Sequence, residues 1–168
     1  MIGGGVYRWA INLALSGKPW IFSRLMQEVI PFNRSHGISV VELSPSGCKV
    51  YLPEKYRNKN HLRTMHACAI ATAAEYVSGL NVVQAFDMEN YRLIMSRIEV
   101  DYVRRPNGFC TAESGISESQ MSQINSELDT EGVSKFSLVS NVTDSKNETV
   151  AFATIHWQVK AWQKVRVK

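Results

Sequence analysis

The sequence has few cysteines, and their spacing suggests no pairing. Its 168 residues include three, Cys48, Cys68 and Cys110, an odd number with no CxxC spacing. A disulfide framework is therefore not indicated, and a reducing compartment, the cytoplasm, is the expected location. Each cysteine is expected to pack as a small buried hydrophobic residue.

The sequence also lacks a hydrophobic run long enough to cross a bilayer. The apolar stretch at residues 1–15 is interrupted by Arg8 and Asn12, and no basic region precedes it. It is too short to span a membrane, so we expect no membrane span. We expect it to pack as a helix together with residues 20–30, and weak contact with a membrane surface is the alternative.

A strong charge of either sign is absent as well. Nineteen basic residues face 15 acidic ones, for a formal net charge of +4 and a pI near 9.0. This mild excess suits a polyanionic small ligand. A nucleic-acid-binding protein would concentrate its basic residues, but the densest group, Lys160, Lys164, Arg166 and Lys168, is typical of a solvated tail. We therefore expect no nucleic-acid partner.

What the chain does contain suffices for one domain. Its 168 residues, 45% of them hydrophobic, can form one sizeable core but not two. We expect a single domain over residues 1–168, with an N-terminal helical extension over about residues 1–32. The expected elements follow a fixed order: a helix at 23–30, a hairpin of strands at 38–43 and 48–52, a helix at 64–78, strands at 94–103 and 109–116, a helix at 117–128, and strands at 134–142 and 149–160. This order predicts an α+β fold in which an antiparallel sheet wraps around a central helix.

The strand at 94–103 is expected to have one wet face. Ile94, Ile98, Val100 and Tyr102 alternate with the charged residues Arg97, Glu99 and Asp101. In the last strand the apolar residues at odd positions from Ala151 to Val159 share a face.

The helix at 64–78 draws attention because it is apolar on every side. Thr64 is a suitable N-cap and Gly79 a suitable C-cap, and a helix without a polar face is a buried one. Glu75 is the one formally charged residue between Thr64 and Phe86. A buried carboxylate is costly, so it is paired, protonated or used in chemistry. The alternative is that Glu75 lies on a solvent-exposed stripe or caps a neighbour.

The start of this helix offers a second chemical group. Free N–H donors and the positive end of the helix dipole lie beside His66 and Ala67, and they suit a developing oxyanion. Ala67 and Glu75 are about 12 Å apart along the helix, and His66 and Glu75 point to roughly opposite sides. These groups cannot cooperate within one helix. Two antiparallel helices from a symmetric dimer could bring them together.

These residues also carry a family resemblance. The run Asn60-His61-Leu62-Arg63-Thr64-Met65-His66-Ala67, followed by Glu75, resembles the Asn–(loop)–His-Gly-Gly–(helix)–Asp/Glu signature of hotdog-fold acyl-CoA thioesterases. The likeness is to a little-characterised branch of the phenylacetate-pathway (PaaI-like) type. The spacings match, and the order of elements matches over residues 23–160.

The resemblance implies hydrolysis of acyl-CoA to free acid and CoA. It implies that the N–H of Ala67 binds the thioester carbonyl and that Glu75 of the partner subunit acts as general base or nucleophile. Asn60 would position water or carbonyl, and His66 would shape the loop. CoA enters as part of the substrate, with no further cofactor and no metal. The assembly would be a homodimer or a dimer of dimers, that is, a homotetramer.

The sequence departs from the family pattern at two places. Ala67-Cys68 replaces the Gly-Gly pair, and Arg63 stands where a glycine is frequent. An alanine still offers its N–H, but its methyl group and Cys68 narrow the approach of the acyl group.

Two other functions are compatible with the sequence. One is dehydration or hydration of a hydroxyacyl thioester by a histidine–acid pair. The other is non-catalytic binding of acyl-CoA. Arg104 and Arg105 could contact CoA phosphates, although ordinary solvated side chains are the expectation for both.

Overall fold

The computed structural model describes the backbone of residues 4–165. Three helices come first: α1 (Gly4–Leu15), α2 (Pro19–Val29) and α3 (Pro31–His36). The strands are β1 (Ser39–Ser44), β2 (Gly47–Leu52), β3 (Tyr91–Tyr102), β4 (Cys110–Ser114), β5 (Val133–Asp144) and β6 (Thr149–Ala161). Between them lie the short helix η1 (Tyr56–Asn58), the long helix α4 (Ala67–Ala85) and α5 (Glu118–Glu131), and η2 (Trp162–Lys164) follows β6.

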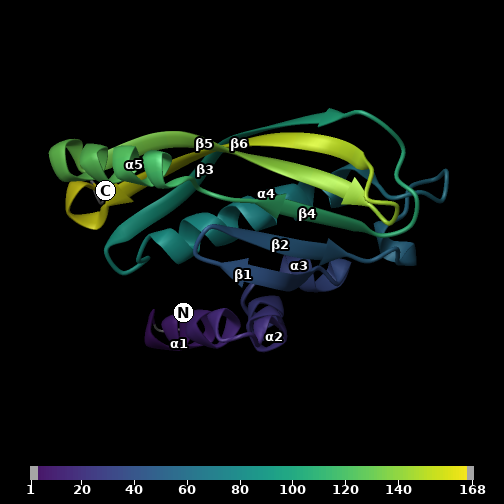
Figure 1. Cartoon of the computed structure of the whole chain (residues 1–168), viewed down its shortest axis with the longest axis horizontal. Coiled ribbons are helices and arrows are strands. Elements are labelled where there is room, and N and C mark those ends of the chain that lie inside the picture. The colour runs from purple at the N-terminus through teal and green to yellow at the C-terminus, as the bar shows by residue number, and fades with distance from the viewer. Residues whose placement is uncertain (1–3, 166–168) are drawn as a thin grey trace.

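The six strands form one antiparallel sheet that curves around α4. Their order is β1-β2-β4-β5-β6-β3, so β1 and β3 are the two edges. Figure 1 shows α4 inside the curve of the sheet, with α1 and α2 beside β1. This arrangement confirms the predicted α+β fold with a sheet wrapped around a central helix.

The apolar surface of α4 explains why the sheet closes on it. Ten of its 19 residues are buried, three of them alanine, whose small side chains let the strands approach closely. Two polar contacts fix its orientation. Ser140 Oγ donates to the carbonyl of Ala74 at 2.8 Å, and Trp157 Nε1 donates to Ser78 Oγ at 2.7 Å. The helix is thus held rigidly against β5 and β6.

Both predicted caps of this helix are wrong. Its N-cap is His66 rather than Thr64, because Thr64 is held in the preceding loop by Asn60. The helix passes through Gly79 and ends at Ala85. A Cβ at Gly79 would lie 3.4 Å from the Trp157 ring, so this glycine provides room for a large neighbour and does not end the helix.

The predicted faces of β3 are wrong at one residue. A register shift between Met95 and Arg97 changes the phase of the strand. Met95 pairs with the buried Trp157 and so lies on the helix side, whereas Ile94 pairs with Gln158 on the outer side. The alternation assumed from the sequence did not allow for this bulge.

Several smaller expectations can be compared with the structure. The hairpin β1–β2 is confirmed, and α5 has Ser117 as N-cap and a left-handed Gly132 as C-cap. The expected apolar face of β6 is buried from Ala151 to Val159. Cys48 and Cys110 are buried as expected, but Cys68 is exposed.

The expectation for the N-terminal end of the chain agrees with the structure, and the expectation for the C-terminal end does not. Residues 4–15 are helical as expected, and residues 1–3 lie outside the described part. Of the basic C-terminal group, Lys160 belongs to β6 and Lys164 to η2, so these two do not form a tail, and Arg166 and Lys168 also lie outside. Within residues 4–165, no helix is long and apolar enough to cross a membrane.

Candidate active site

The start of α4 carries a free backbone donor. The N–H of His66 donates to the Asn58 carbonyl at 2.7 Å, and the N–H of Cys68 donates to His66 Nδ1 at 3.0 Å. Between them, the N–H of Ala67 has no acceptor among the described residues. Ala67 is exposed and lies at the positive end of the helix dipole. An incoming carbonyl oxygen is the kind of acceptor that fits this position.

His66 is occupied in shaping this end of the helix. Because Nδ1 accepts the N–H of Cys68, the neutral imidazole carries its proton on Nε2. The side chain is exposed, and it belongs to the same turn as the free N–H. It acts as a structural cap and has no acidic partner among the described residues.

Asn60 organises the loop that leads into α4. Its Oδ1 accepts from the N–H of Leu62 at 2.9 Å and from both the N–H and the Oγ1 of Thr64 at 3.2 Å. Arg63 closes this turn with a φ of 59°, in the left-handed region. That conformation explains why a glycine suits the position.

Glu75 lies two turns further along α4, half-buried. Burial raises the pKa of its carboxyl group. The carboxylate has no hydrogen-bond donor or cation partner within the part of the chain that is described. It belongs to a partly exposed stripe at i, i+4 spacing with Ala71 and Gly79. The helix is therefore buried on most sides but open along the side that carries Glu75.

The four predicted residues thus fall into two groups. Asn60, His66 and Ala67 come together at the first turn of α4, and Glu75 stands apart on the same helix, about 12 Å away at about 1.5 Å per residue. Within one chain they do not form a single site. Whether two chains complete it stays a prediction.

Tyr102 was missed by the sequence analysis. Its hydroxyl donates to the carbonyl of Ala67 at 2.9 Å, which ties the end of β3 to the first residue of α4. Burial, and secondarily the neighbouring Cys68, raise the pKa of its phenol. No local signal marks this contact, because 35 residues separate the two partners.

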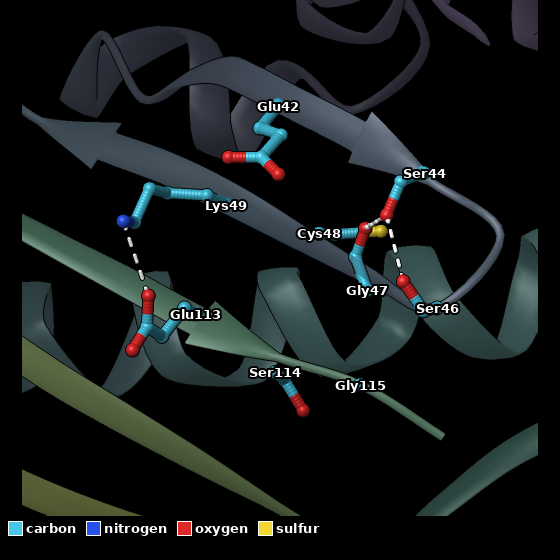
Figure 2. Close-up of a pocket in the computed structure, with 9 residues that line it drawn as sticks. All are labelled: Glu42, Ser44, Ser46, Gly47, Cys48, Lys49, Glu113, Ser114 and Gly115. Atoms are coloured by element: carbon cyan, nitrogen blue, oxygen red, sulfur yellow. Dashed lines mark hydrogen bonds and ion pairs between the residues drawn. The ribbon is translucent and has the colours of Figure 1, made fainter. Parts of the chain in front are cut away.

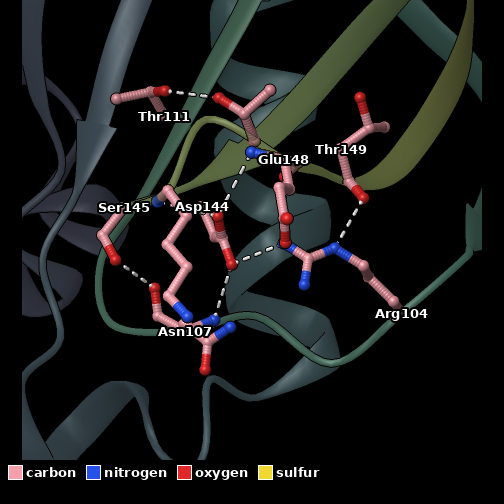
Figure 3. Close-up of polar contacts among 9 residues, drawn as sticks. Arg104, Asn107, Thr111, Asp144, Ser145, Glu148 and Thr149 are labelled. Carbon is pink, nitrogen blue, oxygen red and sulfur yellow. Dashed lines mark hydrogen bonds and ion pairs between the residues drawn. The ribbon is translucent and has the colours of Figure 1, made fainter.

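A polar cluster anchors the chain just beyond β3. The buried carboxylate of Asp144 accepts the backbone N–H groups of Asn107, Lys146 and Glu148, and pairs with Arg104 at 2.7 Å. Figure 3 shows Arg104 and Asn107 turned toward this carboxylate. Desolvation alone would raise the pKa of Asp144, but the three N–H donors and Arg104 lower it to about 2. Arg104 is therefore engaged in structure and is not free for a ligand.

A hollow of about 350 Å³ lies at the other end of α4, beside the β1–β2 turn (Figure 2). Gln84, near the end of α4, contacts this turn through the Ser44 carbonyl and Cys48. Glu113 is paired with Lys49 at 3.1 Å. The hollow contains none of the four predicted site residues. No group of three or more His, Cys, Asp or Glu residues in the described chain is placed to hold a metal ion.

Comparison with known families places the chain. The family described as "Domain of unknown function (DUF4442)" matches residues 18–159. The chain belongs to the DUF4442 family. This match covers α4 and the sheet except the last two residues of β6, and it includes all four predicted residues. No protein with a curated description matches this DUF4442 chain in sequence.

Solved structures show the fold of this DUF4442 protein. A Pseudomonas aeruginosa protein of unknown function, described as a probable thioesterase, is similar with a TM-score of 0.76 and 23% identity, over 92% of this chain and 95% of that one. A thioesterase from Staphylococcus aureus is similar with a TM-score of 0.65 and 12% identity, over 77% and 98%. A protein of unknown function from Chlorobaculum tepidum is similar with a TM-score of 0.73 and 11% identity, over 82% and 91%. The chain has the hotdog fold that the resemblance implied, and the PaaI-like branch stays a prediction.

Proposed function

We propose that this protein hydrolyses acyl-CoA thioesters to the free acid and CoA, at a site completed by a second copy of the chain. The observation that carries the proposal is that one helix presents two polar groups without hydrogen-bond partners among the described residues. The N–H of Ala67 lacks an acceptor among the described residues, and the half-buried Glu75 lacks a donor. A thioester hydrolase site needs both an N–H donor for the carbonyl oxygen and a carboxylate as general base, and these two groups are of those kinds.

A second copy supplies the missing geometry. If two α4 helices lie antiparallel about a two-fold axis beside Ala71, Ala67 of one faces Glu75 of the other, because Ala71 is midway between them. Ala71 and Gly79 are small, so the helices can approach closely. The open edge of β3 supports such a pairing. Its helix-side residues Met95 and Tyr102 are 39% and 47% exposed.

In the proposed reaction, the thioester carbonyl oxygen accepts the N–H of Ala67. The carboxylate of Glu75 takes a proton from water while the water oxygen forms a bond to the carbonyl carbon. The tetrahedral intermediate then collapses, the carbon–sulfur bond breaks, and the CoA thiolate leaves and takes the proton held by Glu75, which restores the carboxylate. The raised pKa of Glu75 makes its carboxylate a stronger base than an ordinary one.

One observation weighs against the dehydratase alternative. Nδ1 of His66 already accepts the N–H of Cys68 as the helix cap, so the side chain is used in structure. A hydroxyacyl-CoA assay for gain or loss of the enoyl absorbance separates the two reactions.

Substitution of the acid tests the proposal. We expect Glu75→Gln to lower kcat for thiol release from a panel of acyl-CoAs by about 10²–10⁴-fold, with fold and oligomeric state kept. The matched control is Glu131→Gln, which removes an exposed carboxylate from α5 and is expected to change nothing. In the wild type, kcat/KM is expected to rise with pH through a pKa above 4.5, and this limb should vanish in Glu75→Gln. Full activity in Glu75→Gln would reject the role of Glu75.

A second variant tests the shared site. We expect Ala71→Leu to separate the two helices and reduce activity, while the monomer fold survives because Ala71 is partly exposed. Undiminished turnover in Ala71→Leu would contradict an axis beside this residue.

A further inference from the structure

A large hollow opens beside the loop between β2 and α4. Its volume is about 770 Å³, inside the range of roughly 300–1,000 Å³ that is typical of small-molecule sites. We call it the basic hollow, after its lining by Tyr56, Arg57, Lys59, His61 and Arg63. The loop between β2 and α4, which lines the hollow, lies at the end of the sheet where β3 finishes and β5 turns into β6 (Figure 1).

Positive charge is concentrated at this hollow. Its lining contains three cations, Arg57, Lys59 and Arg63, and one carboxylate, Glu54, so the net charge of the lining is 3 − 1 = +2. Glu54 is paired with Lys59 at 2.7 Å. The guanidinium groups of Arg57 and Arg63 have no carboxylate partner among the described residues. Free guanidinium groups bind phosphate oxygens in bidentate fashion.

An exposed aromatic ring completes the lining. Tyr56 is 92% exposed, the largest fraction among the exposed large hydrophobic residues of the described chain. A tyrosine ring with so little packing does not stabilise the fold. Beside free guanidinium groups, it offers a flat surface on which a nucleobase can stack.

The basic hollow adjoins the start of α4 directly. Asn60 lines the hollow, and its Oδ1 holds Thr64 in the turn before the helix. Lys59 forms a β-bridge with Met65, and the N–H of His66 donates to the Asn58 carbonyl. The wall of the hollow therefore continues into the turn that presents the free N–H of Ala67. Arg105 lies next to this wall, with Nη2 3.4 Å from the Leu62 carbonyl.

We infer that the basic hollow binds the 3′-phosphoadenosine diphosphate part of CoA. Arg57 and Arg63 hold the phosphates, the adenine stacks on Tyr56, and the pantetheine arm extends past Asn60 to the N–H of Ala67. This inference rests on the proposed function, because it assigns the carrier half of the same substrate. It makes CoA the preferred carrier over a carrier protein, whose phosphopantetheine has no adenine.

The test compares two substrates that differ only in the nucleotide. One is an acyl-CoA, and the other is the same acyl group on pantetheine. We expect Arg57→Gln and Arg63→Gln each to raise KM for acyl-CoA about tenfold, and Tyr56→Ala to raise it by a similar factor. KM for acyl-pantetheine stays unchanged in all three. Lys135→Gln is the control, since it removes one positive charge from the far end of β5.

The outcomes separate this inference from the proposed function. Unchanged KM for acyl-CoA in the variants, or an equal rise for both substrates, overturns the inference while hydrolysis stands. Hydrolysis of an acyl-carrier protein with a higher kcat/KM than acyl-CoA overturns it too.

If wild type releases thiol from neither small substrate, the hydrolase proposal fails, and calorimetry with adenosine 3′,5′-bisphosphate then tests whether the basic hollow binds the nucleotide. Binding by wild type and its loss in Arg57→Gln and Arg63→Gln support the hollow, and absence of binding to wild type overturns it.

Discussion

The two edges of the sheet are completed in different ways. At β1, α2 lies alongside the strand, Ser23 Oγ accepts the N–H of Val40 at 2.9 Å, and Gln27 Nε2 donates to the Ile38 carbonyl at 3.1 Å. At β3, which is twice as long, β6 is the one neighbouring strand within the described residues. Its helix-side residues are partly exposed.

This difference indicates which edge is an interface. A long open edge is a site for pairing with another chain, and proteins cover or shorten the edges that must not pair. In the described residues, the short edge is covered by α2 and the long edge is left open. The comparison therefore supports the dimer that we propose.

The largest effect is expected from a charge on the open edge. Met95→Asp would bury a carboxylate between two copies, so we expect the mass in solution to fall from that of a dimer to that of one chain. Activity should fall by about 10³-fold, because Glu75 is separated from the N–H of Ala67. Light scattering and thiol release measure both quantities.

The covered edge provides the control for this experiment. Val41→Asp places the same charge on β1, where Val41 is 45% exposed. It is expected to leave mass and activity unchanged. Dissociation by Val41→Asp, or a monomeric wild type, would contradict the assignment of the two edges.

The anchor beyond β3 is expected to dominate stability. Asp144→Ala leaves three backbone N–H groups without their acceptor and removes one of the two carboxylates that pair with Arg104, so we expect the free energy of unfolding to fall by about 3 kcal/mol. Urea titration measures this loss. Asp129→Ala, on the exposed face of α5, should stay within about 0.5 kcal/mol of wild type. Similar losses in the two variants would show that Asp144 is no special anchor.

Acid should weaken the same anchor. The pKa of Asp144 is about 2 in the folded protein, against 3.8 for the ordinary group. Its stabilisation is therefore complete above about pH 4 and is lost as the pH falls toward 2. Free energies of unfolding measured across this range should converge for wild type and Asp144→Asn at the acidic end. A constant difference would contradict a depressed pKa.

Most of the fold could be predicted from sequence because its elements carry local signals. The hairpin of β1 and β2, the helix expected at 117–128 and the alternation of β6 each depend on signals from neighbouring residues. The errors arose where distant contacts override such signals. The sequence predicts Gly79 as a cap, whereas the structure shows that it makes room for Trp157. The bulge at Met95 is evident only from the pairing of β3 with β6.

The site was predictable to a smaller extent. Asn60, His66 and Ala67 adjoin in sequence, so their spacing places them together. Tyr102 contacts Ala67 only because the fold brings the end of β3 to the start of α4. Likewise, the structure is needed to show that Glu54 pairs with Lys59, which leaves Arg57 and Arg63 without a carboxylate partner among the described residues. Charge counts along the chain do not distinguish paired from unpaired cations.

The smallest effect is expected at the covered edge. Ser23→Ala removes the acceptor of the Val40 N–H, and Ser23 is 5% exposed, so water does not readily replace it. We expect a loss of about 1 kcal/mol in the free energy of unfolding, seen as a lower urea midpoint with an unchanged slope. Ser16→Ala, at an exposed helix end, is the control. The dimer mass should stay unchanged, because α2 still covers β1 through the rest of its packed face. Higher oligomers in Ser23→Ala would mean that this one bond, rather than the whole helix, keeps the edge closed.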